Sequence, residues 1–328
     1  MKALLALTFV LLTATMGCSS SSSSEVANVP TENLEHKTES TSAPVVFMTT
    51  DISPEGLDAI YEALNWTPTG KVAVKISTGE PPASNYLRPE LIGNLVKKLN
   101  GTIVECNTAY NGSRAEAAMH RQVAEDHGFT KIADVDIMDE DGDIELPVTG
   151  GKNLTANRVG KNFNNYGSFV ILSHFKGHAM AGFGGAIKNV SIGIGSRAGK
   201  SRIHSGGKSD TSPWGGSQIP FTESMAEACK SVSDALGNGE RIIYINVMNR
   251  LSIDCDCNGH PAEPDIHDIG ILGSTDPVAL DQACVDLIYK AEGNASFVRR
   301  MESLQAVHTL EHGEEIGLGI RTYRLETL

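Results

Sequence analysis

Residues 173–188 read S-H-F-K-G-H-A-M-A-G-F-G-G-A-I-K, and they contain two histidines, two lysines and four glycines. The apolar run F-V-I-L at 169–172 comes directly before them and is typical of a buried strand. In open α/β sheets, ligands bind beyond the carboxyl ends of the strands. This stretch therefore predicts a strand followed by a functional loop, with a helix expected at 186–194.

Apolar periodicity continues on both sides of this stretch and predicts alternating strands and helices. Strands are expected at 45–48, 71–76, 102–105, 133–137, 241–247 and 269–272. Helices are expected at 54–64, 89–99, 114–127, 221–236 and 277–289. The alternation predicts an α/β fold with a mainly parallel sheet and flanking helices. About 285 folded residues suffice for one large domain or for two lobes with a cleft between them.

Local signals add detail to this fold. The segments 150–165 and 200–220 are rich in glycine and polar residues, and they are expected to be irregular connections. Asp276 followed by proline is expected to cap the helix that begins there. Asn107 and Asp139 each follow a predicted strand, so a parallel sheet would bring both to the same edge.

The first 18 residues predict an export signal, because Lys2 is followed by a short apolar core. About a dozen apolar residues are too few for a membrane-spanning helix. Cys18 followed by six serines resembles the processing site of a bacterial lipoprotein, which implies a lipid anchor on that cysteine; a plain secretory signal and a periplasmic protein are the alternative. The polar residues 19–44 predict a disordered tether, which leaves 45–328 for the α/β domain.

The chain carries 40 acidic against 27 basic residues, a net charge of −13. Binding of nucleic acid needs a basic surface, so this balance argues against it. A local basic loop in an acidic protein can still hold a small anion. The expected partners are therefore a small anionic ligand or a metal, with membrane contact only through the lipid on Cys18.

The glycines within residues 173–188 predict a loop that holds a cofactor or an anion. Glycine lets the backbone approach a ligand and present N–H groups to it. A lysine in the first turn of the following helix can bind an anion or act as a nucleophile. A glycine turn with a solvated lysine is the alternative. The candidate cofactor-binding residues are Gly182, Gly184, Gly185, Lys188, Lys200 and Arg202.

Histidines and cysteines in the same region predict a metal ion or an iron–sulfur cluster. Thiolate and imidazole are ligands that zinc and iron prefer in proteins. The two cysteines of the C-x-C pair could also form a strained disulfide or remain free thiols. They do not complete a four-iron cluster, which would need Cys106 or other groups as well. The candidate metal ligands are His174, His178, His204, Cys255 and Cys257.

Five longer motifs resemble the bacterial family called domain of unknown function 362. They are V-A-V-K-I-S-T-G-E at 72–80, E-C-N-T-A-Y at 105–110, A-E-D-H-G-F-T at 124–130, the segment 172–189 and D-P-V-A-L-D-Q-A at 276–283. The resemblance extends over residues 45–325. Members are often described as iron–sulfur-centre proteins, so the resemblance implies a cluster on Cys106, Cys255 and Cys257, although the added ferredoxin module of some members has no counterpart in this sequence.

A more distant similarity concerns the segment 178–188, H-A-M-A-G-F-G-G-A-I-K, which is similar to the H-x-x-x-G-[YF]-x-G-x-x-K segment of nickel-pincer lactate racemases. The similarity implies that His178 handles a proton or hydride, that Lys188 is joined to a nickel-pincer nucleotide, and that His204 binds nickel. Where that family has a second catalytic histidine, this chain has Asn107, Thr108, Tyr110 and Arg114. Racemisation needs two opposed acid–base groups, so the departure argues against lactate racemisation itself.

Three functions remain open from the sequence. The first is a metal- or iron–sulfur-binding protein of the cell envelope that is redox-active. The second is a racemase- or epimerase-like enzyme that acts on small hydroxy acids, with His178 and Lys188 as catalytic residues and a cofactor anchored at Lys188. The third is a non-catalytic envelope protein that binds an anion through the glycine–lysine loop.

Overall fold

The apolar run at 169–172 lies in strand β7 (Ser168–His174), whose residues are all buried in the computed structural model. The structure describes residues 42–328, and the expected signal, Cys18 and the tether up to residue 41 lie outside them. Within the described range, no helix combines the length and the apolar character that crossing a bilayer requires.

Strands and helices alternate through much of the described chain. In chain order the strands are β1 (Val45–Thr49), β2 (Val72–Lys75), β3 (Thr102–Glu105), β4 (Val135–Ile137), β5 (Asp143–Pro147), β6 (Ala156–Gly160), β7, β8 (Lys176–His178), β9 (Gly182–Gly184), β10 (Ile242–Met248), β11 (Gly270–Ser274) and β12 (Arg324–Thr327). The α-helices are α1 (Pro54–Ala63), α2 (Pro89–Lys98), α3 (Ala117–Asp126), α4 (Ala186–Ile194), α5 (Arg197–His204), α6 (Gln218–Ala235), α7 (Pro277–Lys290), α8 (Ala295–Ser303) and α9 (His308–Glu315). Two short 3-10 helices are η2 (Phe129–Lys131) and η3 (Lys161–Asn165).

Eight strands form one sheet in the order β12-β1-β11-β10-β7-β2-β3-β4. Strand β7 pairs in parallel with β10 and β2, and the parallel pairing continues through β3 to β4. Strand β11 alone is reversed in this sheet, because it is antiparallel to both β1 and β10. The predicted mainly parallel α/β fold is confirmed. The described residues belong to one unit, so the sheet is not divided into the two lobes that the sequence left open.

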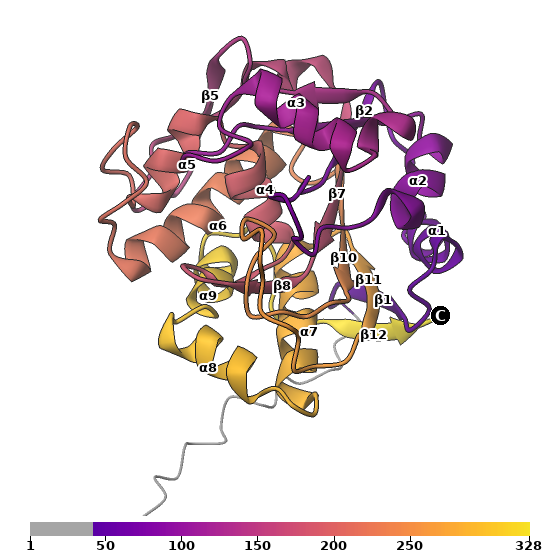
Figure 1. Cartoon of the computed structure of the whole chain (residues 1–328). Coiled ribbons are helices and arrows are strands. Elements are labelled where there is room, and N and C mark those ends of the chain that lie inside the picture. Colours follow the sequence, from indigo (N-terminus) through magenta and orange to yellow (C-terminus); the bar gives the residue numbers. More distant parts are fainter. Residues whose placement is uncertain (1–41) are drawn as a thin grey trace, which may run out of the picture. The chain divides into compact units, whose positions relative to one another are not determined.

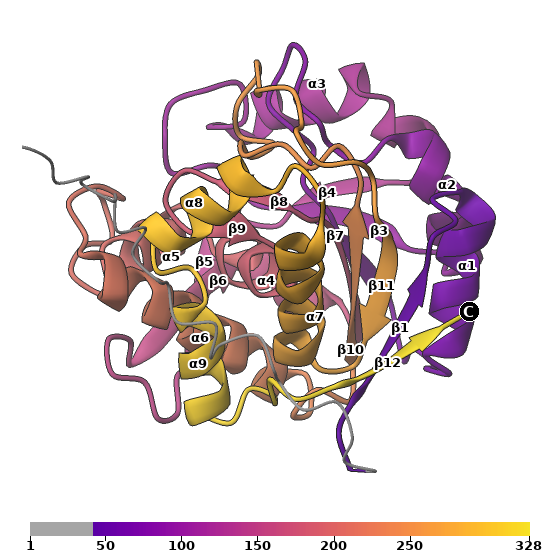
Figure 2. The same cartoon turned by 90° about the horizontal axis from the view of Figure 1, so that it is seen from below.

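Helices cover both faces of this sheet, which explains why its central strands are apolar throughout. Val170 and Leu172 of β7 pack into the core that contains α1 and α2, whereas Phe169 and Ile171 pack into the core that contains α4, α6 and α7. The elements of these two cores lie on opposite sides of the sheet (Figures 1 and 2). Helix α4 begins within residues 173–188, and it packs against the face of the sheet that carries Phe169 and Ile171 of β7.

Two segments expected to be irregular contain regular structure. Within 200–220, helix α5 continues to His204, because the Ser196 hydroxyl caps its start by accepting a hydrogen bond from Gly199 N at 3.0 Å. Within 150–165, β6 pairs with β5 as an antiparallel hairpin. Other local predictions are confirmed: helix α4 has the expected bounds, and Asp276 caps α7 through Val278 N and Ala279 N.

The chain turns sharply after β7 and leads into the site. The β8–β9 hairpin connects β7 to α4, and Gly182 adopts a φ of 80° at its turn. The loop after β10 lies against this hairpin, because a Cβ at Gly177 would come within 2.3 Å of Ile253 O. At the next strands, Asn107 N donates to Asp139 at 2.8 Å, as expected of groups at one sheet edge. The carboxyl edge of the sheet therefore gathers residues far apart in the sequence.

Candidate functional site

A cavity of about 250 Å³ opens beyond the carboxyl ends of β2, β3 and β7. Its wall comes from the ends of β2 and β3, the β8–β9 hairpin, the start of α4 and the loop after β10. Pro213 and Trp214, from the loop between α5 and α6, also line it. The stretch 173–188 therefore forms part of a cavity at the carboxyl edge of the sheet.

A group of possible metal ligands lies in the wall of this cavity. His178, Cys255 and Cys257 each offer one ligand atom, and these atoms lie within 4.8 Å of one another. The three residues meet because the glycine at position 177 lets the backbone of the cysteine loop press against β8. Both cysteines are free thiols, so the disulfide that the sequence left open is not formed in this structure.

The two thiols have different pKa values because they are hydrogen-bonded to each other. A hydrogen bond with Cys257 lowers the pKa of Cys255 well below its usual range despite burial, and the positive charge of Lys188 adds to this effect. The same hydrogen bond and burial raise the pKa of Cys257. The pair therefore carries one readily formed thiolate, which is the form of cysteine that binds a metal ion.

His178 has a defined hydrogen-bonding pattern in this group. Its Nδ1 accepts hydrogen bonds from Met180 N at 3.1 Å and Ala181 N at 2.9 Å, so the hydrogen of the neutral ring is on Nε2. Burial, together with the charge of Lys188, lowers the pKa of His178 and keeps the ring neutral. A metal ion at Nε2 must displace that hydrogen, whereas a thiolate needs no such change. Cys255, whose thiolate forms readily, is therefore the stronger ligand, whereas Cys257 must also lose its proton.

His174 is not brought to this group, which corrects the expected pairing of His174 with His178. Both of its ring nitrogens face oxygen atoms, Nδ1 at 2.8 Å from Asp256 Oδ1 and Nε2 at 2.7 Å from Asn249 O. Asp256, which lies between the two cysteines, also faces Lys176 Nζ at 3.1 Å. Burial alone would raise the pKa of Asp256, but His174 and Lys176 lower it. His174 therefore positions the C-x-C loop.

His204 lines the cavity but lies outside the thiol group, so the three histidines do not meet at one metal ion. Its ring stacks on Phe221 with centroids 5.1 Å apart, and its Nδ1 donates to Lys200 O at 2.7 Å. Burial lowers the pKa of His204 to about 3. The ring is therefore neutral, and its Nε2 has a free lone pair.

The anion nest expected at the glycines is filled by a carboxylate of this chain. The first N–H groups of α4, on Ala186 and Ile187, donate to Asp281 at 2.8 and 3.0 Å. A Cβ at Gly185 would lie 2.3 Å from Asp281 Oδ1. Burial raises the pKa of Asp281 to about 6, even though these N–H groups and Asn246 donate to it. The backbone therefore offers no open anion site at the start of α4.

Packing requires a glycine at position 182 and disfavours a side chain at position 184. A Cβ at Gly182 would lie 2.4 Å from Ala306 Cβ, and one at Gly184 would lie 3.0 Å from Lys188 Cδ. Gly184 and Gly185 do line the cavity, so their lack of side chains keeps it open. Contact of their backbone with a bound ligand stays a prediction.

The charged lining of the cavity is mainly cationic. Glu105 is its one carboxylate. The cationic side chains in the lining are Lys75, Arg114, Lys176, Lys188 and Lys200. In a chain with a net charge of −13, this local excess of positive charge favours negatively charged groups in the cavity.

Several of these cations have partners inside the fold. Lys75 Nζ donates to Ile76 O, to Glu105 at 2.8 Å and to Asn189 at 3.0 Å, so it uses three hydrogens as an ammonium. Burial lowers the pKa of Lys75, and Glu105 opposes this effect. For Glu105, burial raises the pKa, but Lys75 and other cations lower it to about 2. The two groups therefore form a buried ion pair.

Lys188 differs from the other cations in the lining. Within residues 42–328 no hydrogen-bond acceptor or carboxylate pairs with its ammonium group, whereas Arg114 binds Glu80 at 3.0 Å and Lys176 faces Asp256. Lys200 Nζ is held by Gly195 O at 2.7 Å. Lys188 is therefore the cation that is free to meet a ligand in the cavity.

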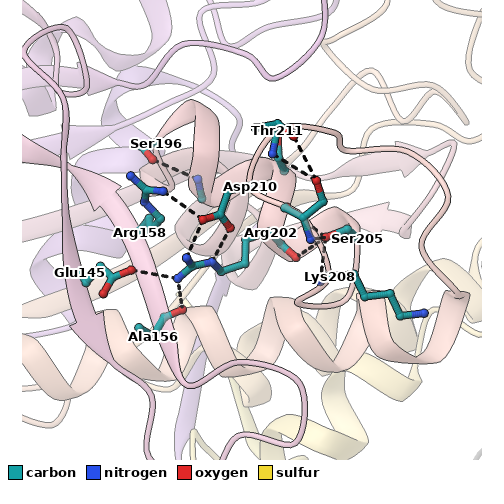
Figure 3. A network of polar contacts seen from close by, with 12 residues as sticks. Glu145, Ala156, Arg158, Ser196, Arg202, Ser205, Lys208, Asp210 and Thr211 are labelled. Atoms are coloured by element: carbon teal, nitrogen blue, oxygen red, sulfur yellow. Dashed lines mark hydrogen bonds and ion pairs between the residues drawn. The ribbon is translucent and has the colours of Figure 1, made fainter.

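Arg202 does not line this cavity, in contrast to its prediction as a cofactor-binding residue. Its guanidinium grips Asp210 through two hydrogen bonds of 2.6 and 2.7 Å, and it also donates to Glu145 at 3.1 Å (Figure 3). These contacts fix the loop that follows α5. Arg202 contributes to the site only through that loop.

Sequence reasoning missed the charged residues at the ends of β2 and β3. Lys75 and Glu105 end otherwise apolar strands, and each is almost fully buried. A charge at the end of an apolar strand is a signal that could have identified them, because an ionised side chain is buried only with a partner. Trp214 was missed because its loop has no periodic pattern.

The family model for a domain of unknown function (DUF362) matches residues 72–286. The chain belongs to this family. The matched range contains every residue that lines the cavity, and it lies within the range 45–325 over which the motifs indicated the resemblance. None of the curated proteins matches this sequence.

Two solved structures are similar to this chain. One is the lactate racemase apoprotein of Thermoanaerobacterium thermosaccharolyticum, with 14% identity, a TM-score of 0.42 and coverage of 74% of this chain and 56% of that one. The other is a Thermotoga maritima protein from a structural genomics consortium, with 11% identity, a TM-score of 0.40 and coverage of 80% of this chain and 58% of that one. This chain therefore spans less than two thirds of the length of each.

Proposed function

We propose that this protein binds one thiophilic divalent metal ion, of which zinc is the prototype, through Cys255, Cys257 and His178. The observation that supports the proposal is the convergence of their three ligand atoms within 4.8 Å in the wall of a cationic cavity. Three protein ligands beside an open cavity leave a fourth coordination position free, as in catalytic zinc sites. The metal would then face any ligand held in the cavity.

A single ion fits these residues better than an iron–sulfur cluster. The group contains two thiols, and four cysteines are the usual ligands of a cluster. Cys106 also lines the cavity, but its Sγ donates to Ile194 O at 3.3 Å. Burial raises the pKa of Cys106 far above its usual range, so it is a protonated core thiol. Cys106 is therefore a poor third sulfur ligand.

The second part of the proposal is that the cavity holds a small organic anion. The unpaired Lys188 and the cationic lining favour negative charge, and the open metal position would receive a carboxylate or hydroxyl oxygen. The metal ion, when bound, acts as a Lewis acid toward such a ligand. Lys188 is then placed to orient the anion beside it.

A second candidate function is a racemase-like enzyme with a cofactor anchored at Lys188. It is favoured by one specific observation, which is that His178, Lys188 and the neutral His204 all line the same cavity. Intact-mass analysis of protein purified from its own host checks this candidate. A mass excess localised to Lys188 would support it, and an unmodified lysine would reject it.

The metal proposal is tested by metal analysis and native mass spectrometry of the full chain after exposure to zinc. We expect one ion per chain, and its loss in Cys255→Ser and Cys257→Ser. Cys284→Ser is the matched control, because Cys284 is a buried thiol of α7 outside the cavity lining. Metal retained by both test variants would overturn the proposal. A visible absorbance band that both variants lose would instead indicate a cluster.

We also propose that the protein works in the cell envelope, as a lipoprotein anchored at Cys18. The support is the sequence alone, namely an apolar signal that ends in a cysteine followed by serines. Metabolic labelling with a fatty acid tests this proposal. Label should enter the wild type and not Cys18→Ala; unlabelled wild type would indicate a plain secretory protein instead.

A further inference from the structure

The loop between α5 and α6, residues 205–217, carries an aromatic side chain to the mouth of the cavity. Both ends of this loop press on other backbone segments. A Cβ at Gly207 would lie 2.2 Å from Asn153 O, and one at Gly216 would lie 2.2 Å from His204 O. The loop is therefore anchored where it leaves α5 and where it returns toward α6.

The middle of the loop is anchored by a charged clamp. Asp210 accepts two hydrogen bonds from Arg202 and a third from Arg158 Nη1 at 3.0 Å (Figure 3). Arg158 in turn binds Asp143 at 2.8 Å. A two-pronged contact between guanidinium and carboxylate defines the geometry more closely than a single surface ion pair does. These contacts therefore fix the middle of the loop, four residues before Trp214.

Trp214 lies at this tip in an unusual environment. It is 63% exposed, more than any other large apolar side chain among residues 42–328, while the neighbouring Pro213 is buried. A Cβ at Gly215 would meet nothing within 4 Å. Yet Trp214 lines the cavity together with Met180. An exposed indole on an anchored loop, at the edge of a cationic cavity, is available for recognition.

We infer that the anion held by this site carries a planar apolar group, and that Trp214 determines this specificity by stacking on it. The inference rests on the proposed function and names the ligand class of the same site. The negative head would meet Lys188 and the metal ion, and the planar group would extend to the mouth, where Met180 and Trp214 offer apolar surface. Stacking on an indole favours an aromatic ligand over a matched aliphatic one by about tenfold.

The test compares lactate with 3-phenyllactate, which share a carboxylate and a hydroxyl and differ by one phenyl ring. The chain contains two tryptophans, and Trp66 lies away from the cavity, where its indole donates to Glu240 O at 2.9 Å. The variant Trp66→Phe therefore leaves Trp214 as the single fluorescent tryptophan. In the zinc-loaded full chain, we expect 3-phenyllactate to change this fluorescence and to bind about tenfold more tightly than lactate.

The deciding variant is Trp214→Ala, measured by calorimetry beside the wild type. We expect the preference for 3-phenyllactate to disappear and the Kd for lactate to stay unchanged, while Trp214→Phe restores most of the preference. Equal affinities in the wild type, or a preference that survives in Trp214→Ala, would overturn the inference and leave the anion site standing. Failure of both acids to bind a zinc-loaded chain would overturn the anion part of the proposed function as well.

Discussion

Lys188 extends from the first turn of α4 into the cavity, and within residues 42–328 its ammonium group forms no hydrogen bond or ion pair, although its charge lowers the pKa of the nearby Cys255. The neighbouring cations bind carboxylates or carbonyl oxygens of the fold and so have less left to offer a ligand. Charged hydrogen-bond donors without partners are unusual at sites this enclosed. The side chain is therefore the first residue to change when anion binding is tested.

We predict that Lys188→Met weakens lactate binding by about ten- to hundredfold, because a hydrogen bond to a charged group contributes about 1.5–3 kcal/mol. Residual binding should also depend less on salt, because one attractive charge is gone. Calorimetry at two salt concentrations provides the measurement. Lys161→Met is the control, since Lys161 is exposed and lies outside the cavity lining. Equal losses in the two variants would refute a specific role for Lys188.

The start of helix α4 is capped by a side chain of helix α7. Its first two N–H groups end on the carboxylate of Asp281, which lies 95 residues from Ala186 in the sequence. Asn246 of β10 donates to the same carboxylate at 2.7 Å. All three of these groups are hydrogen-bond donors. Both terminal atoms of the side chain at position 281 must therefore be acceptors.

We predict that Asp281→Asn lowers the free energy of unfolding by about 2 kcal/mol, because its amide NH₂ faces backbone donors and leaves one of them unsatisfied in the core. Asp286→Asn on the same helix is the control, since Asp286 contacts the Tyr323 hydroxyl, which can also accept a hydrogen bond. Urea unfolding of both variants measures the difference. The role assigned to Asp281 would be wrong if the two variants were equally stable.

Helix α9 is tied to α6 by a histidine between two carboxylates. His312 faces Glu227 at 3.1 Å and Glu315 at 2.9 Å, with Glu223 and His308 nearby. Burial lowers the pKa of His312, but the two hydrogen-bonded carboxylates outweigh it, so its pKa is raised. A raised pKa in the folded state means that the charged contact stabilises the fold fully below the ordinary histidine value, about 6.5, and is lost as pH rises through the raised pKa.

We therefore predict that His312→Gln destabilises the protein by about 2 kcal/mol at pH 6, the contribution of hydrogen bonds to a charged group. The difference from the wild type should shrink at pH 9. Urea unfolding at the two pH values checks this, with His260→Gln as a control for an exposed histidine. A pH-independent difference would show that His312 contributes by packing and not by charge.

Positively charged side chains are concentrated at the cavity, although the chain as a whole is acidic. Five cationic side chains line the cavity of a chain with a net charge of −13. Because the thiol group belongs to a loop between β10 and β11 and to the hairpin after β7, a metal ion there would link segments far apart in the sequence. Binding of such an ion should stabilise the entire fold.

We predict that zinc at a hundredfold excess over its Kd stabilises the protein by about 2.7 kcal/mol. For a chain of this size, that corresponds to a rise in melting temperature of about 5 °C. Thermal unfolding with and without zinc measures the shift. Magnesium should produce no shift, because it prefers oxygen ligands. A zinc-induced shift that persists in Cys257→Ser would place the ion elsewhere.

Most strands of the large sheet, most helices and the parallel pairing could be predicted from the sequence. Apolar runs such as 169–172 indicate strands buried on both faces, and caps such as Asp276 act through residues next to them in the chain. The resemblance in the motifs also indicated the family correctly. These features could be predicted because the physical cause lies within a few neighbouring residues.

Which charged and polar groups are left without partners depends on contacts between distant segments. The carboxylate of Asp281 accepts the hydrogen bonds at the start of α4 that were expected to be available to a ligand. Likewise, Asp210 forms hydrogen bonds with Arg202, and Asp256 forms one with His174. Each candidate is a plausible ligand in the sequence, but its partner comes from another loop or element. A hydrogen bond between such segments depends on how the sheet and its helices pack, and no local pattern encodes that packing.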